Sequence, residues 1–226
     1  MKKTTLVTIL LLLNVLFGFS QEFNPEIRYG KVYYEIEKPT KAYLFGDNVR
    51  LREEPNTDSK FLVEIPIDSE IEIIEKTEFT QLINGIESNW VKIEYKEYKG
   101  YILDNFISVC TKTNINSTLL TTYKKEFKKL YLLLRYLDKQ TNIYIEDKYS
   151  INYENAEILF LENINLSEIS DVLIIDYFAE ACGIEGGKDL IFRFEEFTIE
   201  TVELSAVSDS GVYWLVEDIE FPNEEN

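Results

Sequence analysis

Short segments in which apolar and charged side chains alternate make up most of residues 42–108. The segment 49–52 has this period of two, which recurs over 70–75 and 90–95. Strands that bury one face and expose the other show such alternation. Turn residues separate these segments, and a longer connection is expected over 78–89, where an Asn-Gly pair occurs. The pattern predicts a small all-β barrel.

The motifs of this region resemble those of a bacterial SH3-like domain. That family opens with an Asn-Val-Arg-x-Arg strand and a Pro-containing turn. An apolar strand with a Pro-x-Gly turn follows, and then Trp-x-Lys-Val and Gly-Tyr-Val. The matching residues are Asn48-Val49-Arg50-Leu51-Arg52 with Pro55, Phe61 to Ile65 with Pro66-Ile67-Asp68, Trp90-Val91-Lys92-Ile93, and Gly100-Tyr101-Ile102. Asp68 stands where the family has Gly, so we expect this turn to differ.

The resemblance implies binding rather than chemistry, since several such domains are thought to recognise cell-wall peptides and others mediate contacts. A small barrel leaves a shallow groove between its loops, where aromatic rings can stack on a ligand. The candidate ligand-binding residues are Tyr43, Trp90, Tyr95 and Tyr101. The alternative places Trp90 and Tyr101 in the barrel core. For Trp90 we favour the core, because its neighbours alternate as a buried strand does.

Residues 112–226 form a second predicted domain. Its first part has apolar residues at steps of three and four, which predicts an amphipathic helix. These residues are Leu120, Tyr123, Phe127, Leu130, Leu134 and Leu137. The β-rich segments that follow are 143–145, 156–161, 172–178, 190–194, 197–204 and 212–221. The predicted fold is therefore mainly β, with an SH3-like barrel followed by an α+β domain of one helix and an antiparallel sheet.

Charge divides this second domain. Residues 121–140 hold six basic and two acidic side chains, whereas 141–226 hold three basic and 21 acidic ones. One hypothesis makes the expected helix an element that binds an anionic membrane or a partner. The other lets the helix lie on its own acidic sheet, with the charges compensating one another. We favour the second, because a single helix must bury its apolar face.

The N-terminus has the features of a secretory signal. Met1-Lys2-Lys3 provides a basic start, and the segment 6–19 is almost entirely apolar. We predict a signal peptide over 1–20, a leader with an extra strand over 21–41, and export to the periplasm or the cell exterior. The alternative is an N-terminal membrane anchor, although the apolar segment is short for a span. No membrane span is expected after cleavage.

The chain has two cysteines, Cys110 and Cys182. In an oxidising compartment they could form one disulfide that ties the two predicted domains together. The alternative is a pair of small, buried thiols. The sequence does not decide between these two readings, because it does not show whether the residues lie close together.

Composition excludes several kinds of chemistry. The chain contains no His, which excludes Ser-His-Asp and Cys-His catalysis and His-ligated zinc or haem. Its net charge of −18 argues against nucleic-acid binding, which needs a basic surface. There is no phosphate-binding Gly-Lys-Ser/Thr loop and no dinucleotide fingerprint. We therefore predict no catalytic residue, no metal site and no cofactor.

Three functions fit these observations. The first is an exported, non-enzymatic protein whose barrel binds cell-wall peptide or an envelope protein. The second is a cell-wall-targeted hydrolase with a carboxylate-based site in the C-terminal domain. The third is a structural component of an envelope assembly. The oligomeric state is left open.

Overall fold

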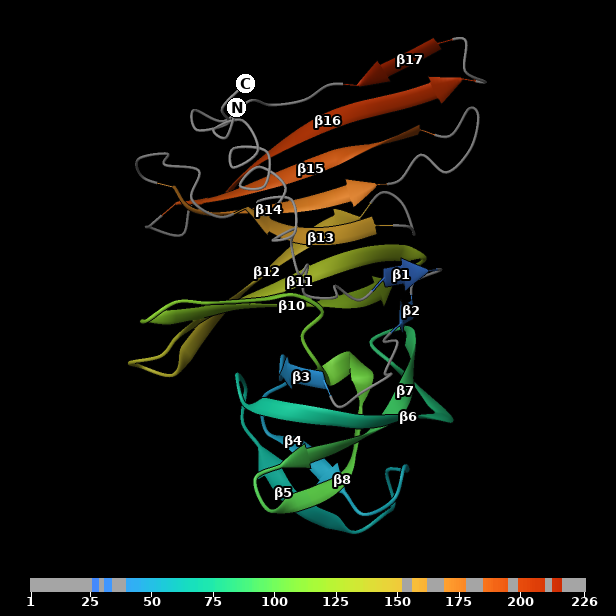
Figure 1. Cartoon of the computed structure of the whole chain (residues 1–226), viewed down its shortest axis with the longest axis vertical. Coiled ribbons are helices and arrows are strands. Elements are labelled where there is room, and N and C mark those ends of the chain that lie inside the picture. The colour runs from blue at the N-terminus through green and yellow to red at the C-terminus, as the bar shows by residue number, and fades with distance from the viewer. Residues whose placement is uncertain are drawn as a thin grey trace, which may run out of the picture.

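The computed structural model describes residues 26–28, 31–33, 40–151, 156–161, 169–177, 185–194, 199–209 and 213–216. Within these residues the chain is built from antiparallel strands and one short 3-10 turn, and contains no α-helix. Three larger sheets follow one another along the long axis of the molecule (Figure 1). The prediction of a mainly β fold is therefore confirmed, and that of an α+β second domain is not supported.

The first sheet has six strands in the order β3-β6-β7-β8-β4-β5. Its strands are β3 (Thr40–Tyr43), β4 (Val49–Arg52), β5 (Phe61–Ile65), β6 (Glu70–Ile83), β7 (Ile86–Tyr95) and β8 (Tyr98–Leu103). This curled sheet wraps around an apolar cluster that includes Leu51, Ile73 and Ile93. A Cβ on Gly100 would lie 2.4 Å from the carbonyl oxygen of Arg52. Gly100 therefore lets β8 approach β4 and keeps the curl tight.

The second sheet, here the central sheet, has four strands in the order β12-β11-β10-β9. It follows the 3-10 turn η1 (Asp104–Phe106) and consists of β9 (Thr111–Thr113), β10 (Ser117–Glu126), β11 (Lys129–Asp138) and β12 (Ile143–Ile151). The helix expected over 120–137 is therefore wrong, because β10 and β11 form a hairpin there. The turn residues Phe127 and Lys128 both have positive φ, as a two-residue primed turn requires.

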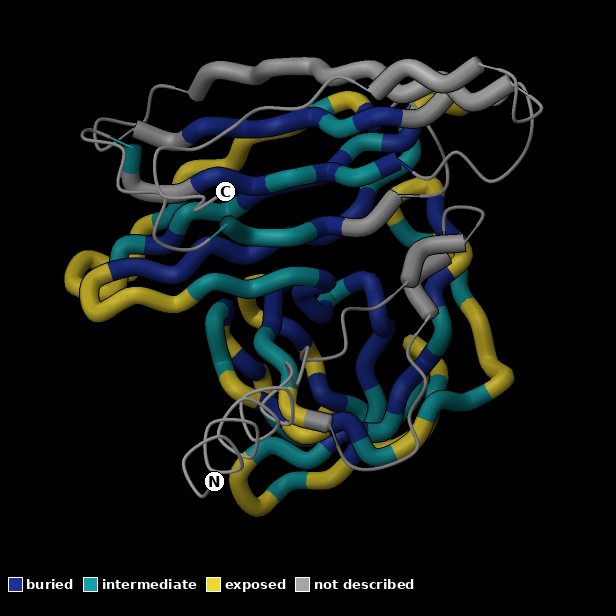
Figure 2. Tube along the Cα trace, turned by 45° about the horizontal axis from the view of Figure 1, so that its top comes forward, coloured by how far each residue is buried: buried dark blue, intermediate teal, exposed yellow. Residues whose placement is uncertain are grey.

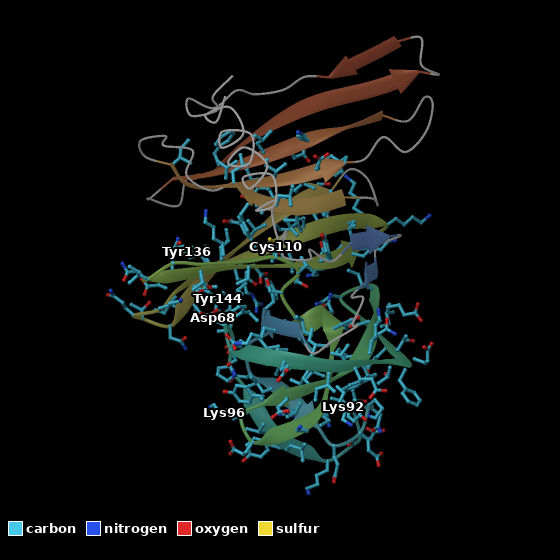
Figure 3. The ribbon with its side chains drawn as sticks, viewed as in Figure 1. Asp68, Lys92, Lys96, Cys110, Tyr136 and Tyr144 are labelled. Atoms are coloured by element: carbon cyan, nitrogen blue, oxygen red, sulfur yellow. The ribbon has the colours of Figure 1, made fainter. Side chains whose placement is uncertain are left out.

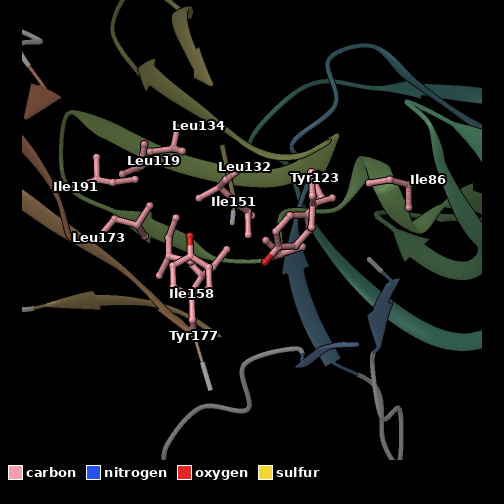
Figure 4. Close-up of a cluster of buried hydrophobic side chains, with 13 residues drawn as sticks. Ile86, Leu119, Tyr123, Leu132, Leu134, Ile151, Ile158, Leu173, Tyr177 and Ile191 are labelled. Atoms are coloured by element: carbon pink, nitrogen blue, oxygen red, sulfur yellow. The ribbon is translucent and has the colours of Figure 1, made fainter. Parts of the chain in front are cut away.

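Burial of both faces explains the false helical pattern. Leu119, Tyr123 and Leu132 point into a cluster shared with the third sheet (Figure 4). Leu120 and Leu133 point the opposite way, into a cluster shared with the curled sheet. Apolar residues taken from the two buried faces of the strands together reproduced the spacing of three and four that one face of a helix has, and that no single face of a strand provides.

The third sheet has the strand order β13-β14-β15-β16-β17. Its strands are β13 (Ala156–Leu161), β14 (Ile169–Tyr177), β15 (Glu185–Phe194), β16 (Ile199–Asp209) and β17 (Tyr213–Val216). Side chains of β13, β14 and β15 share one buried apolar cluster with those of the central sheet. Figure 2 shows buried stretches on the neighbouring strands of the two sheets. The β-rich segments expected between 143 and 221 thus overlap observed strands.

A small hairpin, β1 (Glu26–Arg28) and β2 (Lys31–Tyr33), precedes the curled sheet. The extra strand expected in the leader overlaps β2, and its remaining part lies outside the described residues. The signal peptide predicted over 1–20 also lies outside them. Within the described ranges, the structure contains no helix that is long and apolar enough to cross a membrane.

Candidate functional site

The four aromatic residues predicted to bind a ligand occupy different surroundings. Tyr43 lies on β3 and packs against the cluster between the curled and central sheets. Its hydroxyl donates to the Glu70 carboxylate over 3.3 Å. Burial, together with the negative charge of Glu70, raises the pKa of Tyr43. Tyr43 therefore supports the contact between two sheets rather than facing a groove.

Trp90 and Tyr95 lie on β7. The exposed fraction of Trp90 is only 4%, in agreement with the alternative of a buried tryptophan. Tyr95 packs on the inner core of the curled sheet, and its ring lies 4.9 Å from the Lys96 ammonium. Neither ring therefore offers an open surface on which a ligand could stack.

Tyr101 is different, because it lies on the outer face of the curled sheet. Its neighbours Gly100 and Ile102 are buried, while Tyr101 itself is half-buried. The strand register places Arg52 of β4 opposite Tyr101 on one side and Lys92 of β7 opposite it on the other. Tyr101 therefore lies between two cations.

The register extends this arrangement across five strands. Phe61 of β5 is paired with Arg52, and Glu75 of β6 is paired with Lys92. We call this set the outer row; its members are Phe61, Arg52, Tyr101, Lys92 and Glu75. The row has an aromatic ring beside each of its cations. Of the four predicted residues, only Tyr101 belongs to it.

Contacts within the outer row hold its cations in place. The Lys92 ammonium lies 5.9 Å from the centre of the Tyr101 ring, a distance at which a cation and a ring attract. Arg52 donates from Nη1 to the Ser59 carbonyl oxygen over 2.8 Å. Phe61 is 47% exposed, and the Arg50 guanidinium lies 5.9 Å from its ring. The row is thus partly preorganised and open to solvent at Phe61.

Several contacts hold the curled sheet against the central sheet; we call the region where they lie the junction. The Arg135 guanidinium of β11 lies 4.3 Å from the Phe45 ring and 4.5 Å from the Tyr144 ring. It also donates to the Phe45 carbonyl oxygen over 2.7 Å and pairs with Glu146 over 2.7 Å. One side chain thereby joins a loop of the curled sheet to two strands of the central sheet.

Asp68 makes a second contact across the junction. Its φ of 62° is the left-handed conformation that Gly adopts readily, and Asp tolerates this conformation. Its Oδ2 accepts a 2.9 Å hydrogen bond from the Thr118 hydroxyl, whereas the buried Oδ1 has no hydrogen-bond partner among the described residues. Figure 3 shows Asp68 and Tyr144 at the level of the junction, and Lys92 and Lys96 on the curled sheet.

A third contact is a buried polar network. The Asp104 carboxylate accepts hydrogen bonds from the Ser88 hydroxyl and the Asn89 amide. Burial raises the pKa of Asp104, although these hydrogen bonds act in the opposite direction. Asn105 then donates to the Tyr123 carbonyl oxygen of β10 over 3.0 Å. The network connects β7, η1 and the central sheet.

The β6–β7 turn also touches the central sheet. The Lys125 amide donates to the Asn84 carbonyl oxygen over 2.8 Å. A Cβ on Gly85 would lie 2.1 Å from the Lys125 carbonyl oxygen, and the φ of Gly85 is 74°. Only glycine satisfies both conditions.

The remaining candidate chemistry is sparse. Cys110 packs against the core and forms no disulfide with another described residue, and burial raises the pKa of its thiol to about 12. It is therefore a poor nucleophile. Cys182 lies outside the described residues, so the disulfide between the two cysteines stays a prediction. Within the described ranges, no group of three or more acidic or cysteine side chains is arranged to hold a metal ion.

Four members of the outer row, Phe61, Arg52, Lys92 and Glu75, were not among the predicted site residues. The first three occur in the motifs that carry the SH3-like resemblance, and alternation places Arg52 and Lys92 on exposed faces. Their meeting at Tyr101 depends on the register of four strands, which sequence patterns do not provide.

No family model, curated protein or solved structure matches this chain. The resemblance to SH3-like domains therefore stands on the motifs of residues 42–108.

Proposed function

We propose that the chain is an exported, non-enzymatic binding protein whose curled sheet, an SH3-like barrel, docks on peptides of the bacterial cell wall. The motifs of residues 42–108 and the signal-like N-terminus support this proposal. The second and third sheets serve as the base that holds the barrel.

The outer row is the observation that carries the proposal. Tyr101 and Phe61 lie two strands apart on one face, with Arg52 between them and Lys92 beyond. Adjacent strands are about 4.8 Å apart, so the two rings are separated by about 10 Å. A peptide in extended conformation is long enough to contact both rings.

The rigidity of the support favours binding. The contacts of Arg135, Asp68 and Asn105 attach the curled sheet to the central sheet at separate points. A face held by such a frame loses little conformational entropy when a ligand docks, which strengthens binding.

Sedimentation with purified peptidoglycan tests the proposal. The protein lacking residues 1–20 is mixed with insoluble wall at low and moderate salt, and soluble fragments are monitored. We expect the protein to sediment with the wall at both salt concentrations and to release no fragments.

Two aromatic variants locate the binding face. Tyr101→Ser is expected to weaken binding about fivefold to tenfold, because stacking of one ring contributes about 1 kcal/mol. Phe79→Ser is the matched control, since Phe79 is an exposed ring elsewhere on the curled sheet. It should bind like the unmodified protein.

The other outcomes separate the alternative functions. Release of wall fragments would favour a hydrolase with a carboxylate-based site. Failure to sediment at either salt concentration would overturn the wall proposal. In that case, recovery of a stable partner from envelope extract would favour a structural component.

A further inference from the structure

At least half of the eight cations within residues 40–103 are paired with neighbouring carboxylates. Four of these cations form ion pairs at N–O distances between 2.6 and 3.9 Å. These pairs are Lys41–Glu70, Arg50–Glu64, Lys60–Glu53 and Lys99–Glu94. Pairing is expected in a chain with a net charge of −18, where every cation has many carboxylates to meet.

Arg52 and Lys92 are exceptions. Among the described residues, no carboxylate lies within ion-pair distance of either side chain. Arg52 uses one nitrogen for the Ser59 carbonyl oxygen, and Lys92 lies over the Tyr101 ring. Both cations are half-buried on the same outer face. Two cations without carboxylate partners therefore flank one aromatic ring.

We infer that Arg52 and Lys92 each bind one carboxylate of a single extended peptide that crosses the Tyr101 ring. This inference rests on the proposed function and identifies the ligand's chemistry at the same face. A guanidinium accepts a carboxylate in a two-point contact, and an ammonium binds one as a point charge. The ring between them provides an apolar surface for the peptide between its two acidic groups.

The spacing suits this ligand. β8 lies between β4 and β7, so the two cations are separated by two inter-strand distances, about 10 Å. Residues two apart in an extended peptide lie on the same side, at about 7 Å. Their side chains span the remaining distance.

Charge complementarity excludes the opposite ligand at this face. A cationic peptide would meet two cations that no described carboxylate neutralises, and like charges at an interface disfavour binding. The large negative charge of the whole chain therefore does not describe the part of the outer row from Arg52 to Lys92, where both charges are positive and the carboxylate of Glu75 lies beyond Lys92.

Two double variants test the inference with equal changes in net charge. Arg52→Gln with Lys92→Gln removes the unpaired cations, and Lys41→Gln with Lys99→Gln removes two that are already paired on the same sheet. The wall is used both untreated and after its carboxylates have been converted to neutral amides. Thermal unfolding of each variant checks that the fold is retained.

We expect the first double variant to bind untreated wall at least tenfold more weakly, and the second to bind within about twofold of the original protein. The original protein should also bind amidated wall at least tenfold more weakly. Should the first variant fail to fold, the amidated wall alone decides the question.

The failures of the two proposals are distinguishable. If the original protein binds neither form of the wall, the proposed function is overturned. If it binds both forms equally, or if both double variants bind normally, the protein still binds wall but the carboxylate inference is wrong.

Discussion

The curled sheet and the β10–β11 hairpin of the central sheet differ in how many of their faces are buried. The curled sheet buries its inner face around Ile73 and Ile93 and leaves the outer face to charged and aromatic side chains. The β10–β11 hairpin of the central sheet buries both faces, one against the third sheet and one against the curled sheet. A hairpin with both faces buried offers no face on which to bind a ligand, and its residues serve folding.

The contrast assigns different consequences to substitutions. Changes in the central sheet should alter the free energy of unfolding, whereas changes on the outer row should alter binding and leave the fold intact. The predictions below test this division, beginning with the largest expected effect.

Leu132 and Leu133 are consecutive residues of β11 that point into opposite clusters. Each is at least nine-tenths buried, so replacing either by Ala should lower the free energy of unfolding by about 2–5 kcal/mol. Urea denaturation measures the change. Phe127→Ala, at the exposed tip of the same hairpin, is the control. If only one of the two Leu variants were destabilised, one face of the β10–β11 hairpin would not contribute to the core.

Arg135 tests the junction between the two sheets. Arg135→Met keeps much of the length of the side chain but removes its charge, its contact with two rings and its hydrogen bond to Phe45. We expect a loss of about 1–3 kcal/mol, measured by thermal or urea unfolding. Lys148→Met removes an exposed cation that contacts the Tyr131 ring within the central sheet, and should cost less than about 1 kcal/mol. Equal losses would mean that the junction is no stronger than a surface contact.

Asp104 predicts a pH dependence of stability. Because burial raises its pKa in the folded state, the folded protein holds this proton more tightly than the unfolded chain does. The stabilisation is therefore complete below the pKa of the unfolded chain, near 3.8, and is lost as the pH rises through the folded pKa. Asp104→Asn should remove this component. The stability of the original protein relative to the variant should then fall with rising pH, and a difference independent of pH would contradict the assignment.

Tyr101→Ser should have the smallest effect on folding. The side chain lies on the outer face, so we expect its loss to change the free energy of unfolding by less than about 1 kcal/mol while weakening wall binding. Urea denaturation and sedimentation on the same sample separate the two effects. A destabilisation as large as that of Leu132→Ala would show that the outer row is part of the core.

The exposure of one face of a strand to solvent also determined which strands could be predicted from the sequence. Alternation over 49–52 and 90–95 predicted strands correctly, because Arg50 and Arg52 of β4 and Lys92 and Glu94 of β7 reach solvent between buried neighbours. The hairpin at 120–137 was misread as a helix because both of its faces are buried. Its turn, Phe127-Lys128, contains none of the Gly or Asn residues that normally mark a primed turn. The Asn84-Gly85 turn carries that signal, but the strands on either side were taken for a connection.

The candidate site was predictable only in part. Tyr101 was identified from its motif and lies in the outer row, whereas Tyr43 and Tyr95 occupy other surroundings and Trp90 is buried. Which residues of β4 and β7 would meet Tyr101 depends on register. Register follows from turn geometry and from which residues face the core, and these are settled by the whole sheet rather than by any local segment.

The close approach of Gly85 to Lys125 limits how this protein can be rearranged during evolution. Recombination that moved the curled sheet into another protein would place a different backbone against Gly85 and leave the apolar side of Phe45 without its counterpart. Many binding modules are exchanged between proteins as independent cassettes. The curled sheet is packed directly against the central sheet. We therefore expect the two sheets to be inherited together and new specificities to arise by substitution on the outer row.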